Sequence, residues 1–224
     1  MKKIIVAAGG TGGHIIPALS IAKQLQELGC KILYIGNADS LEQKLATKAG
    51  FEFKQISVQK LYRKFTFAHL RFPFKLIKSI NDSKKIIKEF APDAVIGTGG
   101  FVCGPVGYAA HKLAIPLYLQ EQNSYPGLTT RILSKYAKQI FLGTAGGAKY
   151  LPSEKTLYTG NPINTIKPEK KLSITEYGFR ENATKLFLIG GSQGSLALNN
   201  AIFPILDDLY ANNIDLIWQI GKYS

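Results

Sequence analysis

The sequence has few cysteines, and nothing around them indicates a metal site or a disulfide framework. Only Cys30 and Cys103 occur among the 224 residues, and neither belongs to a CxxC or CxxH pattern. We interpret both as reduced, mostly buried thiols of a cytosolic protein, since a disulfide between them would be unusual in that compartment.

Long hydrophobic runs are missing as well. The uncharged stretch of residues 94–111 is interrupted by glycines and by Pro105, so it predicts no membrane-spanning helix. The apolar start, residues 4–8, runs directly into the glycines of 9–13, which favours a buried strand entering a tight turn over a signal peptide. We expect a protein that is soluble or peripheral to a membrane.

Acidic residues are scarce relative to basic ones. The chain has 28 Lys and Arg against 15 Asp and Glu, a net charge of +13. Such an excess attracts nucleic acid, an anionic membrane surface or phosphorylated small molecules. The sequence has no arginine-rich tail and no aromatic–glycine RNA-binding signature, so nucleic acid is not expected as a partner.

Strand-like and helix-like segments alternate along the chain, which predicts an α/β fold with a doubly wound parallel sheet. The predicted strands are 4–7, 31–35, 51–56, 94–96, 115–119, 139–142 and 156–159. The predicted helices are 17–28, 40–50, 77–90, 105–113 and 127–137.

A change in composition divides the chain. Residues 1–163 form the predicted Rossmann-like domain, and 164–184 is a linker rich in Lys, Pro, Glu and Ser. The pattern of strand, glycine loop, helix and strand restarts in 185–224. One βαβ unit cannot bury both faces of its strands, so we expect this segment to be the start of a second, incomplete Rossmann-like domain.

Three glycine-rich loops join a predicted strand to a predicted helix, at 9–14, 99–105 and 190–194. In parallel sheets such loops lie at the carboxyl ends of the strands, where the N–H groups of the following helix can bind phosphate. Glycine turns also serve tight packing of helix on strand, and this alternative stays open. A dinucleotide-dependent oxidoreductase is disfavoured, because GxGxxG is absent and Asp39 lies past the expected ribose-binding position.

Two sets of polar residues are candidates for chemistry at these loops. His14 follows the first loop directly, where its ordinary pKa near 6.5 suits proton removal from a hydroxyl. A helix-capping or phosphate-binding imidazole is the alternative, and His69 and His111 are interpreted as structural or surface residues. The triplet Glu121-Gln122-Asn123 follows a predicted strand and could bind sugar hydroxyls and amides, or be merely solvated.

Five motifs in one order give the sequence a specific resemblance. They are GGTGGHIIPAL at 9–19, GGFVCGP at 99–105, EQNSYPG at 121–127, GNP at 160–162 and GGSQG at 190–194. Together they resemble the MurG-type transferases, which join N-acetylglucosamine to undecaprenyl-diphosphate-linked N-acetylmuramoyl-pentapeptide, converting lipid I to lipid II in peptidoglycan synthesis. The resemblance implies a two-domain glycosyltransferase-B (GT-B) fold and an inverting transfer without metal or other cofactor.

The resemblance also implies roles for individual residues. His14 would be the base for the muramoyl 4-hydroxyl, and Glu121 and Gln122 would bind the acceptor sugar. The residues implied for the acceptor diphosphate are Gly10, Gly99, Gly100 and Gly104. Those implied for UDP-N-acetylglucosamine are Thr11, Gly12, Gly13, Asn123 and Ser192. The family commonly has arginine where this chain has Asn164, so a cationic donor contact is not expected there.

Residues 61–75 interleave aromatic and basic side chains. A loop and helix with a solvated basic face would explain this pattern. A polyprenyl-linked acceptor instead favours a patch that binds an anionic membrane surface, on the cytoplasmic face of the bacterial plasma membrane. Two other functions stay open: a non-catalytic acceptor-binding subunit of a split transferase, and a nucleotide-sugar epimerase of similar fold.

Overall fold

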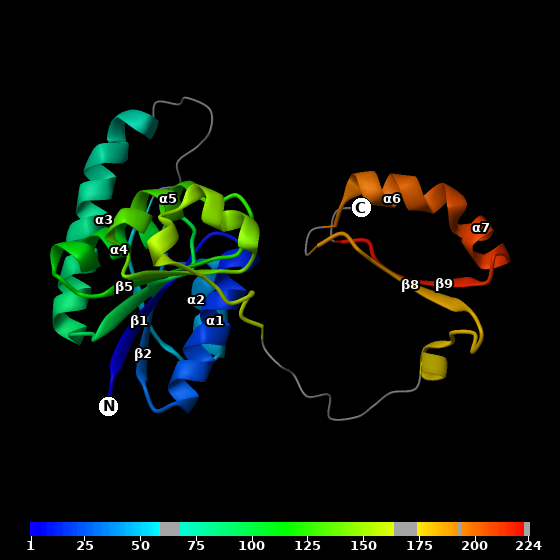
Figure 1. Ribbon diagram of the computed structural model, residues 1–224, viewed down its shortest axis with the longest axis horizontal. Coiled ribbons are helices and arrows are strands. Elements are labelled where there is room, and N and C mark those ends of the chain that lie inside the picture. The colour runs from blue at the N-terminus through cyan, green and yellow to red at the C-terminus, as the bar shows by residue number, and fades with distance from the viewer. Residues whose placement is uncertain (59–67, 164–173, 192–193, 222–224) are drawn as a thin grey trace. The chain divides into compact units, whose positions relative to one another are not determined.

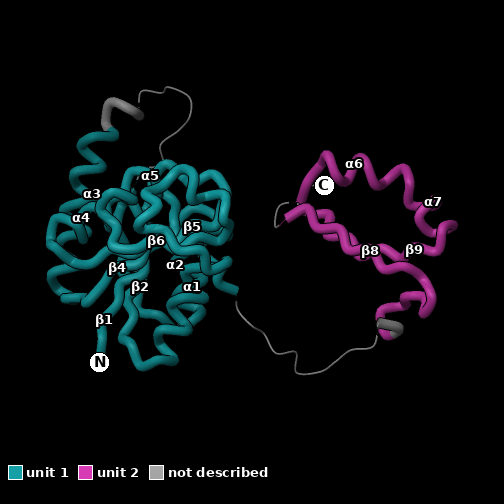
Figure 2. The backbone as a smooth tube through the Cα atoms, in the orientation of Figure 1, with its two compact units in different colours: residues 1–165 teal, residues 166–224 magenta. Residues whose placement is uncertain are grey.

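A computed structural model of the chain describes residues 1–58, 68–163, 174–191 and 194–221 (Figure 1). The chain divides into two compact units, Met1–Thr165 and Ile166–Ser224, which Figure 2 shows in different colours. This division falls two residues after the boundary predicted at residue 163.

Unit 1 is built on a seven-stranded sheet in which every pair of neighbours is parallel. The strands are β1 (Lys3–Ala7), β2 (Lys31–Gly36), β3 (Glu52–Gln55), β4 (Ala94–Gly97), β5 (Leu117–Glu121), β6 (Gln139–Leu142) and β7 (Thr156–Tyr158). Their spatial order is β3-β2-β1-β4-β5-β6-β7, so the winding direction reverses between β1 and β4. The predicted doubly wound α/β class is confirmed, and ligands of such sheets bind where the order reverses.

Helices cover both faces of this sheet (Figure 1). They are α1 (Gly12–Glu27), α2 (Leu41–Lys48), α3 (Ala68–Phe90), α4 (Cys103–Lys112) and α5 (Leu128–Leu133). The sheet lies between two hydrophobic cores, and the side chains of β1 point alternately into one and the other, because successive residues of a strand point to opposite faces. Ile4 and Val6 pack in the core that includes α1 and α2, whereas Ile5 and Ala7 pack in the core that includes α3, α4 and α5.

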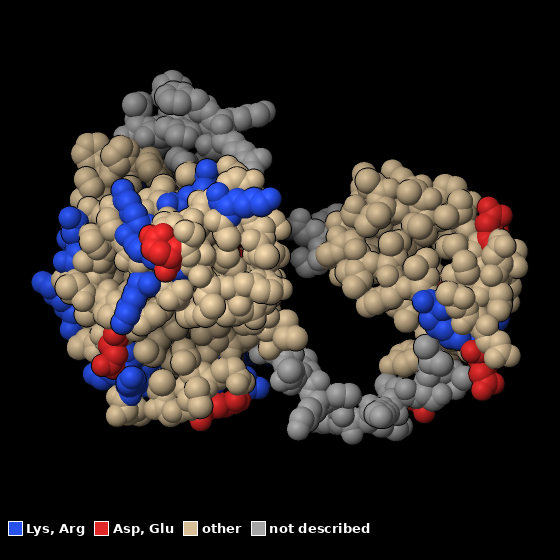
Figure 3. Space-filling model, viewed as in Figure 1, with Lys and Arg blue, Asp and Glu red and all other residues tan. Residues whose placement is uncertain are grey.

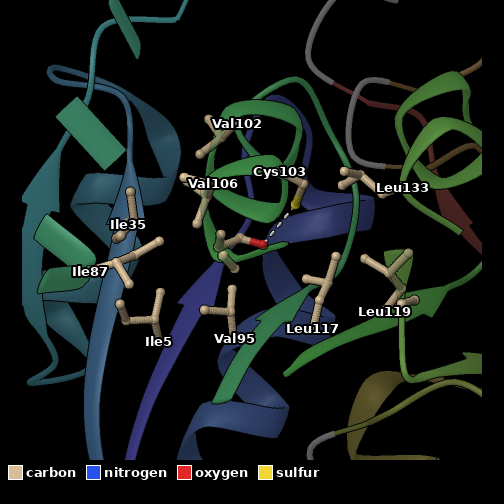
Figure 4. Packing of buried hydrophobic residues seen from close by; sticks show 14 of the residues in the cluster. Ile5, Ile35, Ile87, Val95, Val102, Cys103, Val106, Leu117, Leu119 and Leu133 are labelled. Atoms are coloured by element: carbon tan, nitrogen blue, oxygen red, sulfur yellow. Dashed lines mark hydrogen bonds between the residues drawn. The ribbon is translucent and has the colours of Figure 1, made fainter. Parts of the chain in front are cut away.

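The larger core shows how the sheet holds its helices (Figure 4). Val95 of β4 and Leu117 of β5 are buried beside Ile87 of α3, Val106 of α4 and Leu133 of α5. Burying a side chain of this kind contributes about 1.5–3 kcal/mol. The position of α4 is therefore fixed by its packing, and with it the position of the loop that precedes it.

Two helices begin five or more residues earlier than the sequence predicts. α1 begins at Gly12 after the extended N-cap Thr11, five residues before the predicted start at Pro17. A proline inside a helix removes one i→i−4 hydrogen bond. α1 accommodates this loss at Pro17, so the proline does not mark the first residue of the helix. α3 begins at Ala68 instead of residue 77 and contains Pro73. The earlier start of α1 makes His14 its third residue.

The predicted cap of α2 is confirmed. The Ser40 hydroxyl accepts the N–H of Gln43 at 3.2 Å, and the Gln43 side chain accepts the N–H of Asp39 at 2.7 Å. The first bond satisfies an N–H group that the first turn of the helix leaves without an intrahelical partner, and the second ties that turn to the residue before the N-cap.

Unit 2 contains one βαβ unit. The parallel strands β8 (Thr184–Ile189) and β9 (Ile214–Gln219) are joined through α6 (Leu196–Ile202) and α7 (Leu206–Ala211). Arg180 Nε donates to Asp215 Oδ1 at 2.8 Å, which ties the segment before β8 to β9. Phe187 and Ile189 of β8 are more than half exposed in this unit.

Within the ranges described, no helix is both long and apolar enough to cross a membrane.

Candidate functional site at the carboxyl edge of the sheet

The first two glycine loops touch each other at the point where the strand order reverses. β1 and β4 are paired, with Ala7 opposite Gly97, and the N–H of Thr98 donates to the carbonyl of Ala7 at 3.2 Å. Gly100 has φ +80°, and a Cβ there would overlap the carbonyl oxygen of Gly9. The two loops are therefore in backbone contact, which only glycine at position 100 allows.

Both loops lead into the amino end of a helix. α1 begins at Gly12 and α4 begins at Cys103, and each follows a strand that ends at this edge. A Cβ at Gly12 would meet nothing within 4 Å, so the backbone there is open to a ligand. The first N–H groups of the two helices, with their positive dipole ends, can accept an anion. Of the predicted diphosphate-binding residues, Gly10, Gly99, Gly100 and Gly104 all lie in or beside these loops.

Cys103 holds the second loop against β1. Its Sγ lies 2.9 Å from the carbonyl oxygens of Ala7 and Gly99, and the N–H of Gly99 donates to it at 3.3 Å (Figure 4). Burial raises the pKa of the Cys103 thiol to about 12, so the group is neutral at physiological pH. Of the two predicted buried thiols, Cys103 is buried and Cys30 is half-buried, and both are free.

His14 lies at the junction of both loops and the end of β5. Its Nδ1 is 2.9 Å from Gln122 Oε1, and its backbone carbonyl accepts the Thr98 hydroxyl at 2.8 Å. A Cβ at Gly99 would lie 2.7 Å from Nδ1, so the ring packs directly against that glycine. The side chain is half-buried, and its position among the glycine loops is the one that the sequence predicts.

Glu121 turns back beneath the loop that follows β5. Its buried carboxylate accepts the N–H of Asn123 at 3.1 Å, the Asn123 side-chain amide at 2.9 Å and the N–H of Gly127 at 3.1 Å. Gln122 is also held by protein groups, since its Nε2 donates to the carbonyl of Thr98 at 2.8 Å. This geometry differs from the sugar-binding role expected of Glu121 and Gln122. Asn123, in contrast, is exposed, and Glu121 fixes its orientation.

The third glycine loop belongs to unit 2. Gly191 and Gly194 adopt positive φ, and Ser195 caps α6 by accepting the N–H of Leu198 at 3.4 Å. The predicted donor-binding residue Ser192 lies outside the described residues, as does Asn164. The donor contact of Ser192 stays a prediction.

Other residues that the sequence singled out lie elsewhere or are not described. His111 stacks on Tyr136 with ring centroids 4.1 Å apart, away from the glycine loops. The side chain of His69 is outside the described part of the chain. Among the residues that the structure describes, no group of three or more His, Cys, Asp or Glu side chains could hold a metal ion.

Sequence reasoning missed several side chains that support the site. Glu42 is buried beneath the first loop, where it accepts the N–H of Gly10 at 3.5 Å and the N–H of Asn37 at 3.3 Å. Gln120 donates to Asn161 Oδ1 at 3.2 Å and accepts from Gln122 Nε2 at 2.5 Å. In the sequence, the only signal for Gln120 was its place directly before the polar triplet, and the only signal for Asn161 was its place in the GNP motif.

A parallel sheet with this strand order, two glycine loops at its reversal and a histidine at their junction define the class of the protein. This is the amino-terminal domain of a glycosyltransferase with the GT-B fold, as the sequence predicts. Residues 4–142 match the glycosyltransferase family 28 N-terminal domain, and the chain belongs to that family.

Similar proteins agree with the predicted resemblance to MurG-type enzymes. The chain is 39% identical over 226 residues to a UDP-N-acetylglucosamine--N-acetylmuramyl-(pentapeptide) pyrophosphoryl-undecaprenol N-acetylglucosamine transferase of Bacillus pumilus. It is 37% identical to the protein of the same name in Bacillus subtilis. Each alignment covers 98% of this chain and 62% of the relative, so the chain spans about three fifths of their length.

Solved structures give the same grouping. The crystal structure of Acinetobacter baumannii MurG superposes with a TM-score of 0.74 at 27% identity, covering 100% of this chain and 68% of that one. A UDP-GlcNAc 2-epimerase from Neisseria meningitidis bound to UDP-GlcNAc has a TM-score of 0.59 at 17% identity, covering 100% and 73%. At that identity the epimerase shares the fold alone.

The contact between the loops predicts different costs for two glycine substitutions. Gly100→Ala and Gly50→Ala place a Cβ at nearly the same φ, +80° and +81°, but only the first meets backbone. Gly50→Ala should destabilise unit 1 by about 1 kcal/mol from the positive φ. Gly100→Ala should lower the stability of unit 1 by about 2–5 kcal/mol, because the overlap of its Cβ with Gly9 adds to the strain of the positive φ. Hydrogen exchange of the β1 and β4 amides measures the loss of stability in each variant. Equal losses in the two variants would contradict the contact between the loops.

Proposed function

We propose that the protein transfers N-acetylglucosamine from UDP-N-acetylglucosamine to the 4-hydroxyl of the muramoyl residue in undecaprenyl-diphosphate-MurNAc-pentapeptide. The chain would supply the acceptor-binding domain, residues 1–163, and the beginning of the UDP-sugar-binding domain, residues 185–224. Membership of glycosyltransferase family 28 and relatives of that activity at 37–40% identity support this function. The observation that carries it is the position of His14 between the two glycine loops at the carboxyl edge of the sheet.

His14 is proposed as the general base. Its imidazole takes the proton of the muramoyl hydroxyl while the hydroxyl oxygen attacks C1 of N-acetylglucosamine. The bond between C1 and the UDP oxygen breaks, and its electron pair leaves with UDP. Attack from the face opposite UDP inverts the configuration at C1. General-base assistance of this kind is worth roughly 10²–10⁴ in rate.

The two glycine loops are proposed to hold the acceptor diphosphate. Gly10, Gly99, Gly100 and Gly104 lie where the helices α1 and α4 begin, so backbone N–H groups and two helix dipoles can face the phosphates. A diphosphate held there would lie close to His14, which suits a substrate whose reacting hydroxyl is one sugar ring away from its diphosphate.

The UDP-sugar is proposed to contact this edge as well. Thr11 and Gly13 are exposed at the start of α1, and Asn123 is exposed after β5. Glu121 holds the amide of Asn123 in one orientation, which suits recognition of a sugar substituent. Gly12 and Ser192 are the other residues proposed to bind UDP-N-acetylglucosamine.

Replacement of His14 tests this function in the full-length protein. His14→Gln should lower kcat by roughly 10²–10⁴ with little change in KM for UDP-N-acetylglucosamine, because the base acts in the transition state. His111→Gln is the matched control and should keep near-normal kcat, since His111 lies away from the loops. The measurement is transfer of labelled N-acetylglucosamine to the lipid acceptor.

The products of the same assay separate the alternatives. A lipid-linked disaccharide supports the transferase, and release of free sugar supports an epimerase. No product from the full-length protein would favour a non-catalytic acceptor-binding subunit. A His14→Gln variant with normal kcat would contradict the assignment of the base.

We also propose that unit 1 binds an anionic membrane surface beside the site. An apolar cavity of about 370 Å³ lies between α3, α4 and α5, lined by Phe72, Leu76, Phe101, Leu128 and Ile132 among others. Lys75 and Lys78 of α3, Arg131 of α5 and Lys135 just after it are exposed, so the helices that line the cavity also carry positive charge. Figure 3 shows Lys and Arg side chains, with fewer Asp and Glu among them, on the visible face of unit 1.

The position of this cavity supports a lipid-linked substrate. Phe101 and Gly104 belong both to the cavity wall and to the second glycine loop, so an apolar chain there would lie next to the proposed diphosphate site. Of the predicted membrane segment 61–75, the side chains of 61–71 lie outside the described residues, and Phe72 is the first that the cavity includes.

Sedimentation with vesicles that contain anionic phospholipid tests the membrane proposal. Ile132→Asp should weaken binding about tenfold or more, because it removes an apolar side chain worth about 1.5–3 kcal/mol from the interface. Leu28→Asp is the control, since Leu28 is 79% exposed at the end of α1 and introduces the same charge. Equal binding of the two variants would contradict the location of the surface.

A further inference from the structure

The hydrogen bonds of Gln122 determine which of its two polar atoms faces His14. Gln122 Nε2 lies 2.8 Å from the backbone carbonyl of Thr98 and 3.4 Å from that of Gln120. Carbonyl oxygens only accept, so the atom that faces them must be the NH₂ group of the amide. The orientation of the Gln122 amide, which X-ray density seldom distinguishes, is therefore set by the backbone.

This orientation leaves Gln122 Oε1 facing Nδ1 of His14 at 2.9 Å. An amide oxygen only accepts, so Nδ1 must carry the hydrogen of this bond. In a neutral imidazole the other nitrogen then has the free lone pair. We infer that Gln122 is a positioning residue that holds His14 in the Nδ1–H tautomer and presents Nε2 as the base. The catalytic consequence rests on the proposed function of His14.

Thr98 makes this arrangement rigid. Its carbonyl accepts from Gln122, and its hydroxyl donates to the backbone carbonyl of His14 at 2.8 Å. One residue thus fixes both the backbone of His14 and the amide that holds its ring. Gly99, directly after Thr98, packs against the Nδ1 side of the ring, since a Cβ there would lie 2.7 Å from Nδ1.

Two further amides continue the chain away from His14. Gln122 Nε2 donates to Gln120 Oε1 at 2.5 Å, and Gln120 Nε2 donates to Asn161 Oδ1 at 3.2 Å. Each amide offers its oxygen toward His14 and its NH₂ group away from it. Reversing Gln122 would bring its oxygen against the Thr98 carbonyl, and Gln120, which is buried, favours the same direction.

Nitrogen NMR of the 224-residue chain labelled at histidine tests the tautomer without any activity assay. In its neutral form His14 should show a protonated Nδ1 and an unprotonated Nε2, with the signals assigned by loss in His14→Gln. In Gln122→Leu both signals should move toward the average of the two tautomers, because no acceptor faces Nδ1.

Gln139→Leu is the matched control. Gln139 also donates its amide to a backbone carbonyl, that of Lys155 at 2.8 Å, but at the start of β6 on the opposite edge of the sheet. This variant should leave the His14 signals unchanged. A wild-type His14 protonated on Nε2, or His14 signals that Gln122→Leu does not move, would overturn the inference.

Kinetics of the full-length protein then separate this inference from the proposed function. Gln122→Leu should lower kcat roughly 10-fold to 100-fold, less than loss of the base itself, with KM for UDP-N-acetylglucosamine changed less than about twofold. Unchanged kcat in Gln122→Leu would overturn its positioning role. If the tautomer is as inferred but His14→Gln keeps normal kcat, the proposed base is wrong and the tautomer assignment stands.

Discussion

The pairing of β1 with β4 is the constraint on which the rest of the site depends. These strands are far apart in sequence, and each ends in a glycine loop that leads into a helix. Because they are neighbours, the two loops meet, and Gly100 packs on the carbonyl of Gly9 with no room for a side chain. His14, Thr98 and Cys103 all bond across this contact.

The surrounding side chains serve to keep the loops and His14 in place. Glu42 binds the first loop from below, Cys103 binds the second loop to β1, and Glu121 shapes the loop after β5. These are buried polar groups with partners, which rigidify a site when they are satisfied. A transferase that works by positioning two substrates gains from such a fixed edge, since misplacement of about 1 Å can cost much of the rate.

Most of the fold could be predicted from the sequence, because buried parallel strands are short apolar runs and glycines mark their ends. The strands β1, β4 and β6 lie within a residue or so of their predicted ranges. The start of α1 could not be predicted for two reasons. Proline is typical of the first turn of a helix, whereas Pro17 lies beyond the first turn of α1, and glycine, present at positions 12 and 13, has a low helix propensity.

The site was predictable as a location but not in its internal contacts. Motifs and strand ends place His14 and the glycine loops, because the carboxyl ends of parallel strands share one edge. The direction of a side chain is not part of such a pattern. Glu121 therefore seemed available to a sugar, although its carboxylate is occupied by three N–H groups. The amide chain through Gln120 and Asn161 joins residues 41 apart, which no local spacing reveals.

The central claim is that the first two glycine loops form one anion site for a prenyl diphosphate. It is tested most directly by titrating the labelled chain with a short-chain prenyl diphosphate and following the backbone amide signals. The account predicts that the amides of Gly10, Gly12 and Gly100 shift together with a single Kd. Shifts confined to one loop, or separate Kd values for the two loops, would contradict it.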